Sequence, residues 1–216
     1  MKKIFFSDKF ALTKAVQTGR KTMTGRILRC PKTFQGEEDV VLEFHRSLGC
    51  DFYYDCVVCN GNGKTLGQLP LPYQVGEIVA VAQSYRTIYD EKEEWFGNAK
   101  ANSWWCEVHD HLGGLGPAVM PGYRNKLFVR SEFMPHHICF TDLKFERLQD
   151  ISDEDCLAEG IYFYNQGTDY GFTFNGTRKR YATPKEAFRH LMEGVSRKGI
   201  WKSNPWVAAY TFGVMD

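Results

Sequence analysis

The sequence predicts a mixed α+β domain built around a small β-barrel. Aromatic residues make up 15% of the 216 residues, and such side chains are enriched in half-buried strands. Stretches with strand character recur along the chain and are separated by segments with helix-capping residues. Because 43% of the residues are hydrophobic, the chain can bury a core of its own. We therefore expect a single domain over residues 1–216 that carries inserted loops and a hairpin.

A short amphipathic helix is expected at the N terminus. Ser7 or Asp8 can cap its start, and Gly19 follows Thr18 at the position where a left-handed residue ends a helix. The next segment, GRKTMTGR at 19–26, places a lysine, two threonines and two arginines at the end of that helix. A charged helix end is commonly solvated surface, but these residue types can also form a site.

The middle of the chain is expected to contain strands and insertions. The residues 40–44 have strand character, and Asn-Gly-Asn-Gly at 60–63 favours a hairpin turn. A buried strand is predicted over 77–88. The segment 89–125 is rich in glycine and proline in its second half, and we expect a long loop or flap there.

The last part of the chain contains three predicted strands and two capped helices. The strands are expected at 126–134, 139–148 and 204–212. Ser152 forms a capping box with the acid three residues later, which predicts a short helix that ends at Gly160. Thr183, followed by proline at the first helical position, predicts a second helix that reaches about Gly194.

Charge and composition limit the binding partners and the cellular location that we expect for the chain. The net charge of +1 attracts no nucleic acid globally, so an RNA partner needs a local basic patch, such as residues 2–29 or 178–202. No apolar run is long enough to span a bilayer, and the N terminus becomes polar too soon for a signal peptide. We expect a cytoplasmic protein without a membrane partner, whose seven cysteines are reduced.

The cysteines also suggest a metal site. Cys56 and Cys59 have the CxxC spacing of half a zinc site, and Cys106, His109 and His111 can supply further ligands. The alternative is a pair of reduced surface thiols on a hairpin. A zinc-stabilised interaction protein thus remains one hypothesis, and no other metal or cofactor is expected.

Aromatic residues near the predicted flap allow two interpretations. Tyr85, Trp104 and Trp105 can form a platform on which bases stack. They can equally form a small hydrophobic core of the flap itself.

GRKTMTGR contains two parts of a hydrolytic site. A lysine amine is a weak base at its ordinary pKa of ~10.4, and burial or nearby cations such as Arg20 and Arg26 lower that value. Lys21 can then take the proton of the Thr24 hydroxyl, which becomes a nucleophile. A carboxylate would complete the set, and without it the same residues can simply hold an anion.

Four stretches, in this order along the chain, resemble the ASCH domain family of the PUA-like superfamily, in particular its long variants from bacteria, phages and prophages. They are GRKTMTGRI at 19–27, VGEIVAVAQSY at 75–85, FERLQDISDEDCLAEGI at 145–161 and NPWVAAYTF at 204–212. The resemblance leaves residues 31–70, 89–125 and 162–200 as insertions. Many relatives carry arginine where this chain has Gly25.

The resemblance implies a PUA-like small β-barrel with flanking helices and a cleft that binds RNA or nucleotides. Short bacterial members hydrolyse N4-acetylcytidine with a lysine, a threonine and a glutamate. The matching positions here are Lys21, Thr24 and Glu159. The expected enzyme is an amidohydrolase with Thr24 as nucleophile, Lys21 as base and Glu159 as proton relay.

The alternative is a binding module without chemistry. In that case Lys21, Arg20 and Arg26 hold phosphates of an RNA or nucleotide. Tyr85, Trp104 and Trp105 then stack on its bases.

Overall fold

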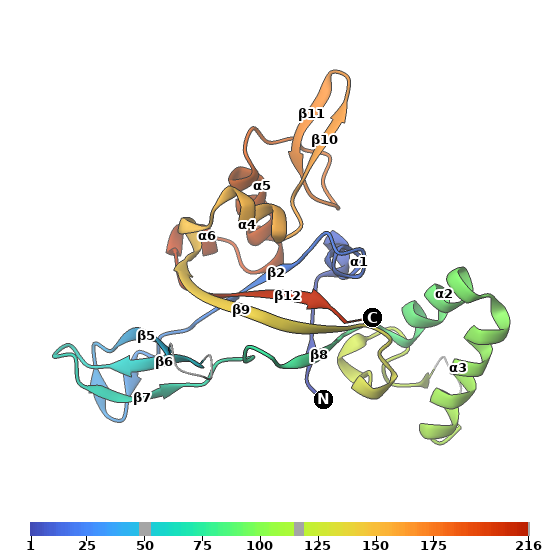
Figure 1. The fold of residues 1–216 in the computed structure, drawn as a ribbon, viewed down its shortest axis with the longest axis horizontal. Helices are drawn as coiled ribbons and strands as arrows, with labels where there is room; N and C mark the ends of the chain where they lie inside the picture. The colour runs from blue at the N-terminus through green and yellow to red at the C-terminus, as the bar shows by residue number, and fades with distance from the viewer. Residues whose placement is uncertain (48–52, 115–118, 216) are drawn as a thin grey trace.

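The computed structural model describes residues 1–47, 53–114 and 119–215. These residues form a mixed α+β fold with 12 strands in four sheets and six α-helices. The mixed class predicted from the sequence is confirmed. Figure 1 shows a central sheet, with a smaller sheet on one side, a pair of helices on the other and a hairpin that projects above.

The central sheet has the strand order β1-β8-β9-β12-β2. The strand bounds, in that order, are Lys3–Ile4, Ile78–Val81, His137–Arg147, Trp206–Val214 and Met23–Ile27. β1 runs parallel to β8, and the other neighbours are antiparallel. The predicted strands at 139–148 and 204–212 are confirmed. β1 and β2 are the ends of this order within the described residues, so the closed barrel stays a prediction.

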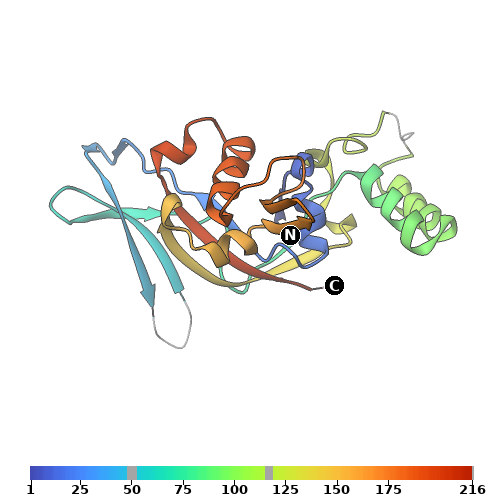
Figure 2. The same ribbon diagram turned by 90° about the horizontal axis from the view of Figure 1, so that it is seen from above.

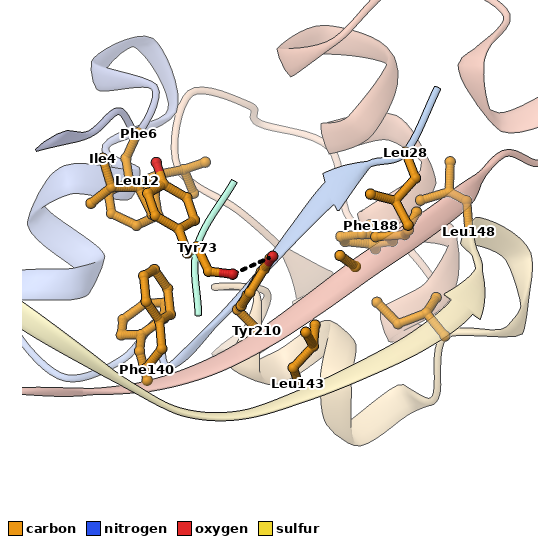
Figure 3. Packing of buried hydrophobic residues seen from close by; sticks show 14 of the residues in the cluster. Ile4, Phe6, Leu12, Leu28, Tyr73, Phe140, Leu143, Leu148, Phe188 and Tyr210 are labelled. Atoms are coloured by element: carbon orange, nitrogen blue, oxygen red, sulfur yellow. Dashed lines mark hydrogen bonds between the residues drawn. The ribbon is translucent and has the colours of Figure 1, made fainter. Parts of the chain in front are cut away.

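Aromatic side chains fill the core beside the central sheet (Figure 3). The rings of Tyr210 on β12 and Phe140 on β9 are fully buried, with centroids 5.1 Å apart. Tyr73 stacks on Phe140 at 4.7 Å. The buried hydroxyl of Tyr210 donates a hydrogen bond to the carbonyl oxygen of Tyr73 at 3.1 Å. Because a buried hydroxyl needs such a partner, the bond holds the segment before β8 against the sheet.

The N-terminal helix is shorter than predicted. A 3-10 turn covers Asp8–Phe10, and α1 covers Leu12–Gln17. The helix is interrupted at Ala11, whose backbone is left-handed with a φ of 49°, and the expected side-chain cap from Ser7 does not form. Gly19 follows the helix with a φ of 68°, as the sequence indicated.

The segment after β2 forms two small sheets. One has strands β3 (Thr33–Phe34) and β4 (Glu37–Glu38), and the other has β5 (Val41–Ser47), β6 (Tyr53–Cys59) and β7 (Thr65–Leu69). The side chain of Asn60 accepts hydrogen bonds from the backbone N–H groups of residues 62 and 64. This turn joins β6 to β7 and confirms the predicted hairpin. Phe44 on β5 stacks on Phe145 of β9 at 4.3 Å, which fixes this sheet to the central one.

The predicted flap is a helical hairpin. α2 covers Tyr85–Phe96 and α3 covers Asn98–His111. The predicted strand at 77–88 ends early, because the side chain of Ser84 caps α2 by accepting a hydrogen bond from the backbone of Thr87. Figures 1 and 2 show the two helices beside each other at one end of the molecule. The loop prediction was therefore wrong for residues 89–111.

The prediction of a strand at 126–134 was also wrong. Two 3-10 turns, Lys126–Phe128 and Ser131–Phe133, occupy this segment. The side chain of Asn125 accepts a hydrogen bond from Leu127 N and starts the first turn. The segment is held by side chains rather than by strand pairing, since Lys3 Nζ donates to the carbonyl oxygen of Val129 at 2.6 Å.

Both later helices follow their predicted caps. α4 covers Asp153–Ala158 and α5 covers Pro184–Val195, and the hydroxyls of Ser152 and Thr183 accept hydrogen bonds from the backbone three residues on. The remaining elements of this part are the hairpin strands β10 (Tyr162–Gln166) and β11 (Asp169–Thr173) and the short helix α6 (Ile200–Ser203). Among the described residues, no helix combines the length and apolar character needed to cross a membrane.

Candidate active site

The start of β2 lies between the ends of α1 and α4. Lys21 donates its backbone N–H to the carbonyl oxygen of Ala15 in α1, and Thr22 donates to Ala158 of α4, both at 2.8 Å. Thr22 in turn accepts a hydrogen bond from Phe212 of β12 at 2.8 Å. These bonds fix the backbone of GRKTMTGR at Lys21 and Thr22 and therefore fix the point from which the Lys21 side chain extends.

Lys21 and Glu159 form a buried ion pair. Lys21 is 1% exposed and Glu159 is 7% exposed. The ammonium Nζ contacts Glu159 Oε2 and also donates to the backbone carbonyl oxygen of Glu159 at 2.9 Å. Two residues 138 positions apart in the chain thus meet at the C-terminal end of α4, and two of the three expected catalytic residues are in direct contact.

Gly25 completes this arrangement. Its backbone N–H donates to Glu159 Oε1 at 2.5 Å. A Cβ atom at this position would lie 2.9 Å from Val207 Cγ1 and 3.4 Å from Glu159 Oε1. Because real Cβ atoms do not approach a neighbour as closely as 2.9 Å, a side chain at this position would require Val207 to shift. The sequence identified the glycine as a departure from the ASCH pattern but not its role.

Burial lowers the pKa of Lys21 from its ordinary value. The main cause is desolvation, which disfavours the charged ammonium; Glu159 opposes the shift, and the positive charge of Arg26 adds to it. The net direction is the one that a general base needs.

Thr24 lies on β2 between Lys21 and Arg26. It is directly opposite Tyr210 in the register with β12 and is 3% exposed. Its chain neighbour Gly25 donates its backbone N–H to the Glu159 carboxylate. Hydrogen bonds found among the described residues join Lys21 to Glu159 but do not include one from Lys21 to the Thr24 hydroxyl.

The two arginines of the motif contact aromatic rings. Arg20 lies over Tyr162 of β10 at 4.8 Å, and its buried Nε has no hydrogen-bond partner in the part of the chain described. Arg26 lies 5.9 Å from the Phe6 ring, and Lys21 Nζ lies 5.7 Å from the same ring. The buried Phe6 thus lies beside both cations, a role that nothing in the sequence pattern signalled.

Little open space adjoins the ion pair. A cavity of about 10 Å³ next to Glu159 is lined by Gly25, Met23 and Val207, among others. That volume is close to the lower limit for one water molecule. A substrate therefore reaches Lys21 and Thr24 only if the side chains that cover them move.

The predicted base-stacking residues lie elsewhere. Tyr85 and Trp104 are buried in the helical hairpin, and Trp105 packs beside them. The Tyr85 and Trp104 rings are 6.3 Å apart, and the Tyr85 hydroxyl accepts a hydrogen bond from the backbone N–H of Arg130. These rings form the core of α2 and α3, so the second interpretation of the sequence applies and the platform is not formed.

The predicted zinc ligands are separated by the fold. Cys56 and Cys59 are buried in β6, which corrects the alternative of surface thiols, and desolvation raises the pKa of Cys56 to about 11. Cys106 is exposed on α3. Within residues 1–47, 53–114 and 119–215, no three potential metal-ligating side chains gather at one place. The structure therefore gives the zinc hypothesis no support.

Comparison of the chain with protein-family models, with curated proteins and with solved structures finds no match.

Proposed function

We propose that the chain is an amidohydrolase of the ASCH type, within a PUA-like fold, that removes the acetyl group from N4-acetylcytidine or a related modified nucleoside in the cytoplasm. The observation that carries the proposal is the buried pair of Lys21 and Glu159, whose lysine belongs to the same motif as the buried Thr24. Burying two charges costs several kcal/mol per ion even when they are paired, about as much as their attraction returns. Such a pair is a costly way to stabilise a fold, whereas a desolvated lysine next to a carboxylate suits proton transfer.

The chemistry follows from the roles of the three side chains. The proton of the Lys21 ammonium first moves to the Glu159 carboxylate within the pair. Neutral Lys21 then takes the proton of the Thr24 hydroxyl, and the hydroxyl oxygen attacks the acetamide carbonyl. The C–N bond breaks as Glu159 passes a proton to the leaving cytosine amine. Water then hydrolyses the acetyl ester on Thr24, which releases acetate and restores the hydroxyl. The overall balance is amide plus water to amine plus acetic acid, which releases its proton to become acetate.

The test is turnover of N4-acetylcytidine by the purified protein, followed by ultraviolet absorbance and chromatography of cytidine. We expect Lys21→Met, Thr24→Val and Glu159→Gln each to lower kcat by at least about 10²-fold, the usual contribution of a general acid or base. Lys144→Met is the matched control, because Lys144 forms an ion pair with Asp155 of the same helix α4 but is 42% exposed. Full turnover in the Lys21 and Thr24 variants would refute the proposed mechanism.

A second candidate is a site that binds a nucleotide without chemistry. The buried Arg20 Nε favours it, because an unpartnered guanidinium nitrogen suits an anionic oxygen. Lys21 and Arg26 can add further contacts to a phosphate. Nucleotide binding that weakens with salt, together with no turnover by the wild type, would favour this candidate.

A further inference from the structure

One face of the hairpin β10–β11 is aromatic and exposed. The register places Phe163 opposite Phe172 and Asn165 opposite Tyr170, so these four side chains share a face. Phe163 is 54% exposed and Tyr170 is 64% exposed. Figure 1 shows the hairpin extending beyond α4 and α5. A two-stranded hairpin is marginally stable by itself, and this one leaves the rings of Phe163 and Tyr170 largely exposed. Exposed apolar side chains gathered on one face indicate a surface that binds a partner.

The aromatic face continues from the hairpin into the body. Phe172 pairs with Tyr181 in a β-bridge, and its ring lies 5.2 Å from that of Phe163. Tyr181 stacks on the buried ring of Phe174 with a centroid distance of 6.4 Å and an angle of 13° between the planes. We call Phe163, Tyr170, Phe172 and Tyr181 the aromatic strip. It is anchored in the core through Phe174 and exposed at the tip.

A groove of about 630 Å³ adjoins the inner end of the strip. Its walls come from Tyr181, α5 and α6 and include the cationic or aromatic side chains of Arg189, His190, Trp201 and Lys202. The acids of the groove are bound to backbone donors. Glu193 accepts hydrogen bonds from Gly199 N at 2.7 Å and from Trp201 N at 3.0 Å.

The second acid of the groove, Glu186, likewise accepts a hydrogen bond from Ala182 N at 3.2 Å. These hydrogen bonds hold the two carboxylates against the backbone but leave them charged, and Arg189 and Lys202 are exposed beside them. The exposed Arg178 and Lys179 lie just before Tyr181 in the chain. Cations therefore flank the aromatic strip on the groove side and along the segment that follows β11.

We propose that the aromatic strip and the adjoining groove bind single-stranded nucleic acid. Bases stack on the exposed rings of Phe163 and Tyr170, because every base has a π face. Phosphates contact Arg189 and Lys202, and these contacts are salt-dependent. The combination of exposed rings with flanking cations favours a polyanion with planar groups over an apolar protein surface. This surface is separate from the Lys21 pair, and its binding does not require that the pair hydrolyse an amide.

The test is fluorescence anisotropy with labelled oligouridine, labelled oligodeoxythymidine and a labelled RNA duplex. We expect both single strands to bind more tightly than the duplex, whose bases are already stacked. Phe163→Ala with Tyr170→Ala should weaken binding at least about tenfold, within the range for lost base stacking. Arg189→Ala with Lys202→Ala should weaken it too and reduce the slope of log K against log salt by about 0.7 per lost phosphate contact.

Two controls separate this surface from other exposed rings and cations. Trp95→Ala removes a ring that is 73% exposed on α2, and Lys144→Met removes a cation that is 42% exposed on β9. Both should bind single strands as the wild type does. Circular dichroism checks that each variant is folded, and Phe163→Trp should retain affinity. The proposal is overturned if neither single strand binds, if the duplex binds as tightly, or if the variants of the strip bind unchanged.

Discussion

Replacing Glu159 with glutamine removes one charge of the buried pair and keeps an oxygen for the Gly25 N–H. Lys21 is 1% exposed, so its ammonium would lose its counter-ion without gaining water. Leaving one member of a buried pair unmatched costs about 3–5 kcal/mol. We expect Glu159→Gln to lower the free energy of unfolding by that amount, and the double variant Lys21→Met with Glu159→Gln to recover most of the loss.

Urea unfolding of the wild type, both single variants and the double variant measures the coupling between the two side chains. The pair of Lys144 and Asp155 is the control, because Lys144 is 42% exposed and exposed pairs contribute about 0.2–1 kcal/mol. If the Lys21 and Glu159 coupling is no larger than that of the control pair, the charges are not desolvated as the structure has them. The reasoning about the site would then be wrong.

Three further predictions concern single side chains. Folding lowers the pKa of Lys21, so between that lowered value and about 10.4 the unfolded chain binds more protons than the folded one, and the contribution of Lys21 to stability rises with pH. Urea unfolding from neutral pH to about pH 10 should therefore show a rise in the free energy of unfolding of the wild type minus that of Lys21→Met. A fall in this difference would contradict the pKa shift. Gly25→Ala puts a Cβ 2.9 Å from Val207 and should lower the free energy of unfolding by about 1–3 kcal/mol, with a lower thermal midpoint. Gly213→Ala is the control, because open space surrounds Gly213, and it should leave the thermal midpoint nearly unchanged. Equal effects of the two variants would argue against close packing at Gly25. Tyr210→Phe leaves a backbone carbonyl oxygen without its donor and should cost about 1–3 kcal/mol in chemical denaturation, and a neutral change would indicate that water replaces the hydroxyl.

Local signals in the sequence predicted the parts of the fold that local interactions determine. Ser152 and Thr183 cap α4 and α5 as expected, because a cap is a hydrogen bond between residues three apart. The turn at Asn60 followed in the same way from its own side chain. The hairpin β10–β11 has alternation in YFYNQGTDYGFT and a turn at Gly167 with a positive φ, whereas the ASCH resemblance assigns this stretch only to an insertion.

Predictions failed where contacts distant in sequence decide the structure. The glycines and prolines after residue 112 led to a loop prediction for all of 89–125, yet α2 and α3 form before them because Tyr85, Ile88 and Trp104 bury one another across the helix pair. The apolar residues of 126–134 suggested a strand, yet Leu127 and Phe128 are exposed and the segment is held by Lys3. In both segments, contacts with residues from other elements outweigh local propensity.

For the candidate site, the sequence by itself determined the chemical groups: Lys21 and Thr24 at the end of a helix, with Glu159 added through the ASCH resemblance. Only the tertiary structure decided that Glu159 contacts Lys21, that Gly25 holds the carboxylate and that Phe6 lies beside the cations. The physical reason is desolvation. The pKa of Lys21 depends on the water that α1, α4 and β12 exclude when they pack around it, and that exclusion is a property of the folded chain rather than of any segment.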